Sequence, residues 1–422
     1  TIASNKCHLW VDNAYVGEYS SATSGLAATA FRIYTTTSEF EVDDISVYNT
    51  LPAESTTWTT SWSNGNPDST KEAIIDGTYS TTTNGAFTAK KLTVTSLGSL
   101  TINSGTNVTV QNEVLNDGSL IVENDANLIQ VNNTTNTGNA VVKRNSNPLS
   151  RLDYTLWSSP VANQNLLAFS PLTSNTSVVT TPITTVNRFY TYDSATNFYV
   201  AIPDPAFATT VFAKGTGYLI RMPNTAVAAP GTETFNGVFT GVLNNGDINL
   251  TGLTAGQYVA VGNPYPSAIS ADSFIDANST GAGSGTLYFW RKTNNLNQST
   301  TPTTSYATYT KAGPVGLPAG SGTANEGFTP NGTIAVGQGF ITTVPTSGTI
   351  VFTNALRSSS TTAQFLRTKA LAEKSRVWLN LSEGTNPVNQ MMVAYMDGAT
   401  TGFDAGIDGK YINDAATALT SD

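Results

Sequence analysis

The stretch that decides the fold, Ala-Lys-Gly-Thr-Gly-Tyr-Leu-Ile-Arg-Met-Pro at 213–223, recurs as Ala-Val-Gly-Gln-Gly-Phe-Ile-Thr-Thr-Val-Pro at 335–345. Upstream, Tyr-Thr-Leu-Trp-Ser-Ser-Pro at 154–160 is matched by Tyr-Val-Ala-Val-Gly-Asn-Pro at 258–264, 104 residues later. The matched positions are glycines, prolines and apolar strand residues, and no His, Cys or paired acid is repeated. The repeat predicts a duplicated β-sandwich region over 148–357, built as two similar sandwiches or as two halves of one.

Both copies contain a Gly-x-Gly, at Gly215 and Gly217 and again at Gly337 and Gly339. A nucleotide-binding loop would need a third glycine and a following helix. Here a strand that ends in proline follows both times, so we expect a bulge or a close approach of two backbones.

A shorter repeat precedes the duplication. Gly-Ser-Leu-Thr-Ile at 98–102 and Gly-Ser-Leu-Ile-Val at 118–122 lie 20 residues apart, and Val108 matches Leu128 at the same offset. Short strands at this period, with Gly and Asn at the corners, predict a β-solenoid of four or five coils over 54–147. The pair Trp58 and Trp62 is expected to cap the open end of the stack, and a sugar-stacking pair is the alternative.

The two ends of the chain also read as strands, so the whole chain is expected to be all-β. Residues 366–422 begin with a helix-like or linker stretch and continue with a hairpin of 376–381 and 390–395, the start of a C-terminal β domain. Residues 1–50 alternate strongly and end in Val-Asp-Asp-Ile-Ser-Val at 42–47. They are too few for a free-standing sandwich.

This N-terminal segment is similar to the closing part of lectin-like jelly rolls, of the concanavalin and carbohydrate-module type. In several such modules an acid of the last strand holds a structural calcium, which makes Asp43 or Asp44 the candidate by resemblance. The alternative is that these acids protect an edge strand from pairing with other chains.

Composition excludes several classes of function. Only 12% of the 422 residues are charged, and the formal charge of −9 disfavours nucleic acid and anionic membranes as partners. No stretch is apolar enough to insert directly into a membrane. The single cysteine, Cys7, excludes an intrachain disulfide, which in an exported protein favours a bacterial surface. The single histidine, His8, lies in an alternating strand pattern, so no catalytic residue and no required cofactor is expected.

One acidic loop near the C-terminus is a candidate metal site. It runs Asp-Gly-Ala-Thr-Thr-Gly-Phe-Asp-Ala-Gly-Ile-Asp-Gly at 397–409 and lacks the spacing of an EF-hand. A weaker calcium turn would use Asp404 and Asp408, and the alternative is a glycine-rich loop whose acids face water.

Most of the chain, roughly residues 58–412, resembles surface proteins of Bacteroidetes that the type IX secretion system exports. The matching stretches are 62–67, 153–161, 262–267, 337–340 and 395–404. The resemblance implies secretion and attachment by that machinery, to the outside of a Gram-negative bacterium. It also implies glycan attachment at Asp-Ser/Thr sites, which makes Ser194 in Asp-Ser-Ala and Ser69 in Asp-Ser-Thr candidates. Because neither end looks natural, we expect a piece of a longer, processed protein.

The function expected from these observations is that of a non-catalytic surface protein, an adhesin or a stalk that displays a binding module. Glycans or a host surface are the expected partners, met by aromatic faces such as Tyr199, Tyr265 and Trp290. One alternative is a polysaccharide-degrading enzyme whose catalytic part lies outside this fragment. Another is a filament or sheath subunit that pairs through edge strands.

Overall fold

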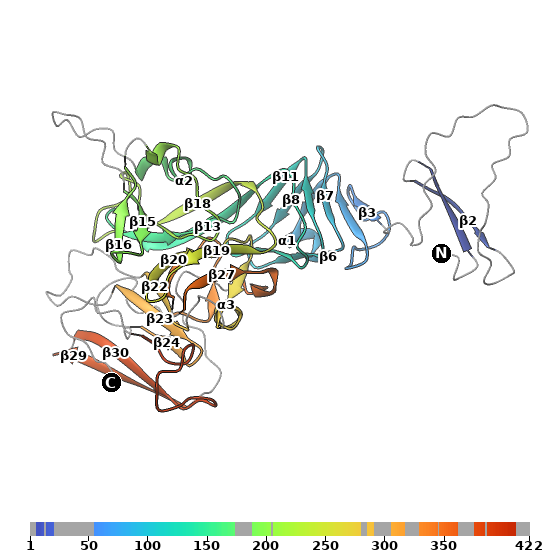
Figure 1. The fold of residues 1–422 in the computed structure, drawn as a ribbon. Helices are drawn as coiled ribbons and strands as arrows, with labels where there is room; N and C mark the ends of the chain where they lie inside the picture. The colour runs from blue at the N-terminus through green and yellow to red at the C-terminus, as the bar shows by residue number, and fades with distance from the viewer. Residues whose placement is uncertain are drawn as a thin grey trace, which may run out of the picture. The chain divides into compact units, whose positions relative to one another are not determined.

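The computed structural model describes residues 6–11, 14–20, 55–173, 188–203, 206–279, 285–290, 305–316, 329–344, 346–361, 375–384 and 386–410 (Figure 1). Its contacts divide the chain into two units, Thr1–Ser55 and Thr56–Asp422. The chain is all-β, as expected. In the first unit, β1 (Lys6–Val11) and β2 (Ala14–Ser20) form an antiparallel hairpin that contains His8. The predicted strand over 42–47, with Asp43 and Asp44, lies outside the described residues.

The second unit begins with a β-solenoid of about four turns. Its strands form three parallel ladders, one for each face of the solenoid. Successive coils contribute β4 (Glu72–Ile75), β5 (Thr78–Ser80) and β6 (Phe87–Ala89); β7 (Leu92–Val94), β8 (Ser99–Ile102) and β9 (Asn107–Val110); β10 (Val114–Asn116), β11 (Ser119–Val122) and β12 (Asn127–Gln130).

The register confirms the predicted period of 20 residues. Leu100 lies beside Leu120, and Val108 lies beside Leu128. All four side chains are buried, because alternate residues of each short strand point into the stack. Stacked coils thus bury apolar positions that no single coil could bury alone.

Aromatic side chains close the N-terminal end of the solenoid, as predicted. β3 (Ser55–Trp58) joins the edge of the first ladder, and α1 (Thr81–Asn84) follows β5. Trp58 is buried and packs edge-on against Trp62 and Tyr79, with ring centroids 5.3 and 4.7 Å away. Because Trp62 also packs on Phe87, this pair serves as a cap over the first coil.

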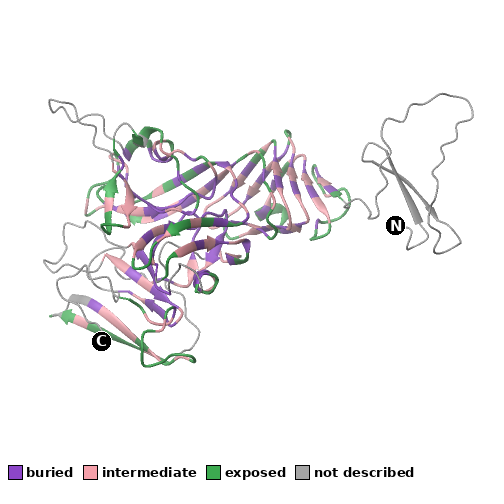
Figure 2. Cartoon of the chain, viewed as in Figure 1, coloured by how far each residue is buried: buried purple, intermediate pink, exposed green. Residues whose placement is uncertain are grey.

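The other end of the solenoid continues directly into the duplicated region. β13 (Asn139–Leu149) pairs in parallel with β11 and in antiparallel fashion with β18 (Glu233–Val242). The boundary expected between residues 147 and 148 therefore lies inside one strand. One hydrophobic core runs from Trp58 in the solenoid to Phe239 in β18, and Figure 2 shows buried residues throughout both parts.

The first copy, which we call lobe one (residues 148–242), has a four-stranded antiparallel sheet. Its order is β14 (Tyr154–Trp157), β17 (Tyr218–Arg221), β15 (Phe189–Asp193) and β16 (Phe198–Ala201). Short helical segments lie beside it: α2 (Leu166–Phe169), η2 (Pro171–Thr173) and η3 (Ala206–Ala208).

The second copy, lobe two (residues 243–361), repeats this order and adds one strand. Its sheet is β20 (Tyr258–Gly262), β26 (Gly339–Thr343), β22 (Leu287–Trp290), β23 (Tyr306–Thr310) and β24 (Gly313–Val315). The remaining elements are β19 (Ile248–Leu253), β27 (Gly348–Phe352), β21 (Ala268–Ser270), β25 (Thr333–Ile334), β28 (Arg357–Ser358), α3 (Ala271–Asn278) and η4 (Asn354–Leu356).

The strand registers of the two lobes are equivalent. Tyr154 lies opposite Arg221 in lobe one, and Tyr258 lies opposite Thr343 in lobe two. These partners differ by the same 104 and 122 residues that separate the repeated sequences. The predicted duplication is therefore a duplication of structure.

The described C-terminal part is a hairpin of β29 (Arg376–Glu383) and β30 (Asn386–Ala394), as predicted. It lies against β24, where Arg376 Nε donates to the carbonyl of Ala312 at 2.6 Å and Trp378 Nε1 donates to that of Pro314 at 3.2 Å. The helix-like stretch expected over 365–374 lies outside the described residues.

Candidate functional site

The two lobes meet through an approximate two-fold contact. The backbone N–H of Ser158 donates to the carbonyl of Gly337 at 2.8 Å, and that of Gly262 donates to Gly215 at 2.9 Å. These bonds are equivalent, since each residue of one bond has its repeat in the other. Lobe one shares its core with the solenoid, and lobe two has a separate core. The duplication therefore gives two sheets of equivalent strand order, one in each lobe, that pack on a shared layer of side chains.

The second glycine of each Gly-x-Gly lies at a close approach between the two lobes. A Cβ at Gly339 would be 2.7 Å from Leu156 Cγ and 3.0 Å from its carbonyl oxygen. A Cβ at Gly217 would be 2.8 Å from the carbonyl oxygen of Val261. Real Cβ atoms do not come this close to backbone, so glycine is required here for contact between the lobes. The prediction of close packing is confirmed.

A layer rich in tyrosine fills the space between the two sheets. Buried Leu156, Leu219, Tyr288 and Ile341 form its centre, and equivalent residues of the two lobes surround them: Tyr154 and Tyr258, Tyr192 and Trp290, Tyr199 and Tyr306. Burial raises the pKa of Tyr154 and of Tyr192 to about 12. The interface is therefore built to hold neutral phenols.

Of the three aromatic residues expected to meet glycans, Tyr265 is buried, and Tyr199 and Trp290 are partly buried. Tyr265 is fully buried, and the guanidinium of Arg357 lies 4.2 Å from its ring centroid. The rings of Tyr199 and Trp290 pack edge-on at 5.7 Å across the lobe interface. The expectation of an exposed aromatic platform at Tyr265 is wrong, because apolar periodicity does not tell a buried ring from a displayed one.

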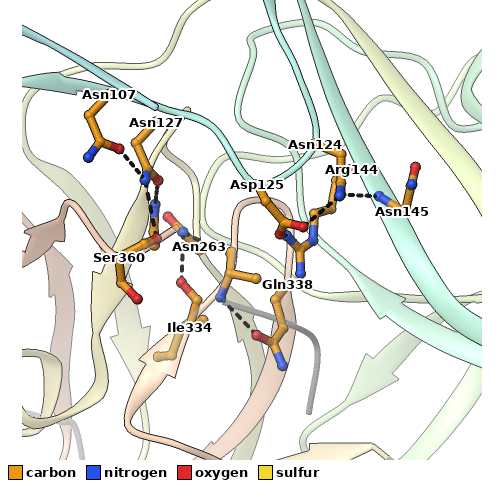
Figure 3. Close-up of polar contacts among 12 residues, drawn as sticks. Asn107, Asn124, Asp125, Asn127, Arg144, Asn145, Asn263, Ile334, Gln338 and Ser360 are labelled. Carbon is orange, nitrogen blue, oxygen red and sulfur yellow. Dashed lines mark hydrogen bonds and ion pairs between the residues drawn. The ribbon is translucent and has the colours of Figure 1, made fainter. Parts of the chain in front are cut away.

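A polar seam joins the solenoid to lobe two (Figure 3). Buried Asn127, on β12, donates to Asn107 Oδ1 at 2.8 Å and to the carbonyl of Ser360 at 3.2 Å. Its own Oδ1 accepts the backbone N–H of Ala268 at 2.8 Å. One asparagine thus links two solenoid coils to β21 and to the segment after β28 in lobe two.

Arg357 strengthens the same seam. Its guanidinium donates to the carbonyls of Leu128 and Asn244 and to Asn245 Oδ1, at 3.3, 3.2 and 2.8 Å. Burial lowers the pKa of this guanidinium. A cation held by carbonyl oxygens and a ring face fixes the position of lobe two on the solenoid.

Ion pairs bind neighbouring coils of the solenoid to one another. Arg144 Nη1 and Asp125 Oδ1 are 2.5 Å apart at the corner before β12 (Figure 3), and Lys143 Nζ lies 2.8 Å from Glu123 Oε1. Both pairs join residues 19 or 20 positions apart, which is one coil. These acids are occupied in holding the stack.

The acids of the predicted calcium turn close their own loop. Asp404 accepts hydrogen bonds from the hydroxyl and backbone N–H of Thr400, and Asp408 Oδ2 accepts the backbone N–H of Asp404 at 2.7 Å. The loop docks on lobe two through Gly406, whose carbonyl accepts the N–H of Lys311 at 2.8 Å. Both carboxylates remain half-exposed, so calcium at this turn stays a prediction.

The two predicted glycan-attachment residues lie in surface turns. Ser194 follows Asp193, whose carboxylate accepts the N–H of Ala195 and the hydroxyl of Thr196 at 2.9 and 2.8 Å. Exposed Ser69 follows Asp68, which makes the same kind of turn with Thr70. These bonds lower the pKa of both carboxyls.

In the Asn107–Asn127 and Arg144–Asp125 contacts the two partners are 20 and 19 residues apart, which is about one coil of the solenoid. The 20-residue period of the sequence could therefore have predicted both contacts. Arg357 has no such signal, because its acceptors lie more than 100 residues earlier in the chain.

Comparison with known proteins places the chain in a family. The model of a domain of unknown function, DUF8693, matches residues 51–422, so the chain belongs to this family. No curated protein and no solved structure matches the chain. Among the described residues, no helix has the length and apolar character needed to cross a membrane.

Proposed function

We propose that this chain is a non-catalytic, secreted surface protein of a Gram-negative bacterium, which acts as a stiff stalk or adhesin. The observation that carries the proposal is the sharing of β13 between the solenoid and lobe one. A strand that belongs to two parts leaves no flexible linker between them, so load on one part reaches the other.

The seam at Asn127 and Arg357 is a second observation that supports the same function. It ties lobe two to the solenoid through side chains that are buried or enclosed by carbonyl oxygens. Parts that are joined both by the shared strand β13 and by this seam resist bending better than domains connected by flexible linkers. This stiffness suits a protein that holds a binding module away from a cell.

The expected partners are glycans or a cell surface, with export and attachment by the type IX machinery as the resemblance implies. A non-catalytic role is supported by carboxylates that make structural contacts, such as Asp125 in its ion pair with Arg144 and Asp404 in its hydrogen bond with Thr400. Calcium at Asp404 and Asp408 would stiffen the loop that docks on lobe two.

A combined retention and turnover assay tests this function. Beads coated with the purified chain are exposed to bacterial and host surface polysaccharides, and both retained polymer and released reducing ends are measured. We expect saturable retention of at least one polymer without release. Release of reducing ends that disappears when a carboxylate is changed to its amide would establish an enzyme instead.

A further inference from the structure

The two lobes differ at one edge of their otherwise equivalent sheets. In lobe two, the outer edge of β23 is paired with β24, with Thr308 opposite Val315 and Thr310 opposite Gly313. The equivalent strand of lobe one, β16, is the last strand of its sheet. Within the described residues, no strand pairs with the outer edge of β16.

This edge carries unusual side chains for a surface. Phe198 is 71% exposed and Val200 is 48% exposed, while Tyr199 between them points to the lobe interface. Lobe two has Ser305 and buried Ala307 at the equivalent positions. The chain from Ser194 to Pro203 has no charged residue, although charges are the usual protection of an exposed edge.

We propose that a second copy of this chain docks at β16, so that the two β16 strands pair antiparallel about a two-fold axis. This axis is perpendicular to the sheet, so the same face of the sheet points the same way in both copies. Side chains on one face of β16 therefore meet side chains on the same face of the partner's β16. In the register that buries most apolar surface, Phe198 lies opposite Val200 of the partner subunit, and Tyr199 lies opposite its own copy. The two four-stranded sheets then form one continuous sheet.

The occupant follows from the duplication. At the equivalent edge in lobe two, a strand of this same chain already completes the sheet. Under two-fold symmetry, Phe198 and Val200 of one copy also pack against Val200 and Phe198 of the other. An unrelated partner would need its own apolar residues at matching positions. The resulting dimer carries two framework bodies joined through their first lobes, a property that goes beyond the proposed function of each.

Sedimentation velocity of the full chain at increasing concentration tests the dimer. A four-residue edge gives a small interface, so we expect a weak dimer that appears between about 1 and 300 µM. Val200→Lys places a charge on the edge and is expected to raise the dissociation constant at least about tenfold. Leu172→Lys, which adds the same charge at a 54% exposed position of η2, is the matched control and leaves the dimer intact.

A second pair of variants tests the register and guards against misfolding. Phe198→Lys and Val200→Glu are each expected to be monomeric alone, and their mixture is expected to form a dimer, because Lys and Glu then face each other. Circular dichroism verifies that each variant is folded. A wild-type chain that stays monomeric throughout, or a Val200→Lys variant that dimerises like Leu172→Lys, would overturn the proposal. A mixture that stays monomeric would contradict the pairing of Phe198 with Val200.

Discussion

At the scale of single residues, glycine and tyrosine have complementary roles where the lobes meet. Gly217 and Gly339 bring the two backbones together at the two-fold contact. Tyrosines of equivalent strands then fill the wider space beside it. The sequence shows the repeated glycines as a pattern. The structure gives the physical reason for them, because a side chain at either position would collide with a carbonyl oxygen of the other lobe.

Replacement of one of these glycines tests the contact. Gly339→Ala forces a methyl group against Leu156, and we expect a loss of about 1–3 kcal/mol in the free energy of unfolding, as for other overpacked sites. Urea denaturation measures it. Gly402→Ala is the matched control, since the nearest atom to its Cβ is 3.8 Å away. Equal stability of the two variants would show that the lobes do not meet as described.

The buried phenols of the interface predict an alkaline instability. The ordinary Tyr pKa is about 10, and burial raises that of Tyr154 and Tyr192 to about 12 in the folded chain. Below pH 10 both states keep these protons. Between about pH 10 and 12 the unfolded chain releases protons that the folded chain retains, so stability falls as pH rises.

The urea midpoint measured from pH 8.5 to 11.5 checks this expectation. It should fall progressively above about pH 10. Tyr192→Phe removes one contributing phenol and should make the fall less steep. A midpoint that stays constant to pH 11.5 would mean that the phenols are open to water.

At the scale of elements, local repeats predicted more than long-range pairings did. The 20-residue spacing of Leu100 and Leu120 was enough to predict the coils, because each coil contacts only its neighbours. β13 was divided between two predicted domains, because its second partner, β18, lies about 90 residues later. The seam at Arg357 was missed for the same reason.

The seam asparagine provides an element-scale prediction. Asn127→Ala removes donors to Asn107 and Ser360 and leaves the buried N–H of Ala268 without its acceptor. We expect a loss of about 1–3 kcal/mol in the free energy of unfolding. Asn66→Ala, at an exposed position outside the coils, should leave the urea midpoint unchanged. If both variants match the wild type, the seam does not hold lobe two.

At the scale of the whole molecule, the solenoid and both lobes are expected to act as one body. The solenoid and lobe one share β13 and a core that reaches from Trp58 to Phe239. Lobe two is joined to them by the seam at Asn127 and Arg357 and by the tyrosine-rich layer. The secretion route, the glycans at Ser194 and Ser69 and the calcium at Asp404 and Asp408 remain predictions that concern what is attached to this body. Its unity is the physical claim on which the stalk function depends.

Hydrogen exchange of the full chain, compared between the wild type and Asn127→Ala, tests this claim most directly. One body opens globally as a unit, so the slowest amides of β7–β12 and those of β20–β26 should exchange together. A loss of about 2 kcal/mol at the seam should speed both groups about 30-fold. If the variant speeds exchange in lobe two and leaves the solenoid unchanged, the two parts are independent and the account is wrong.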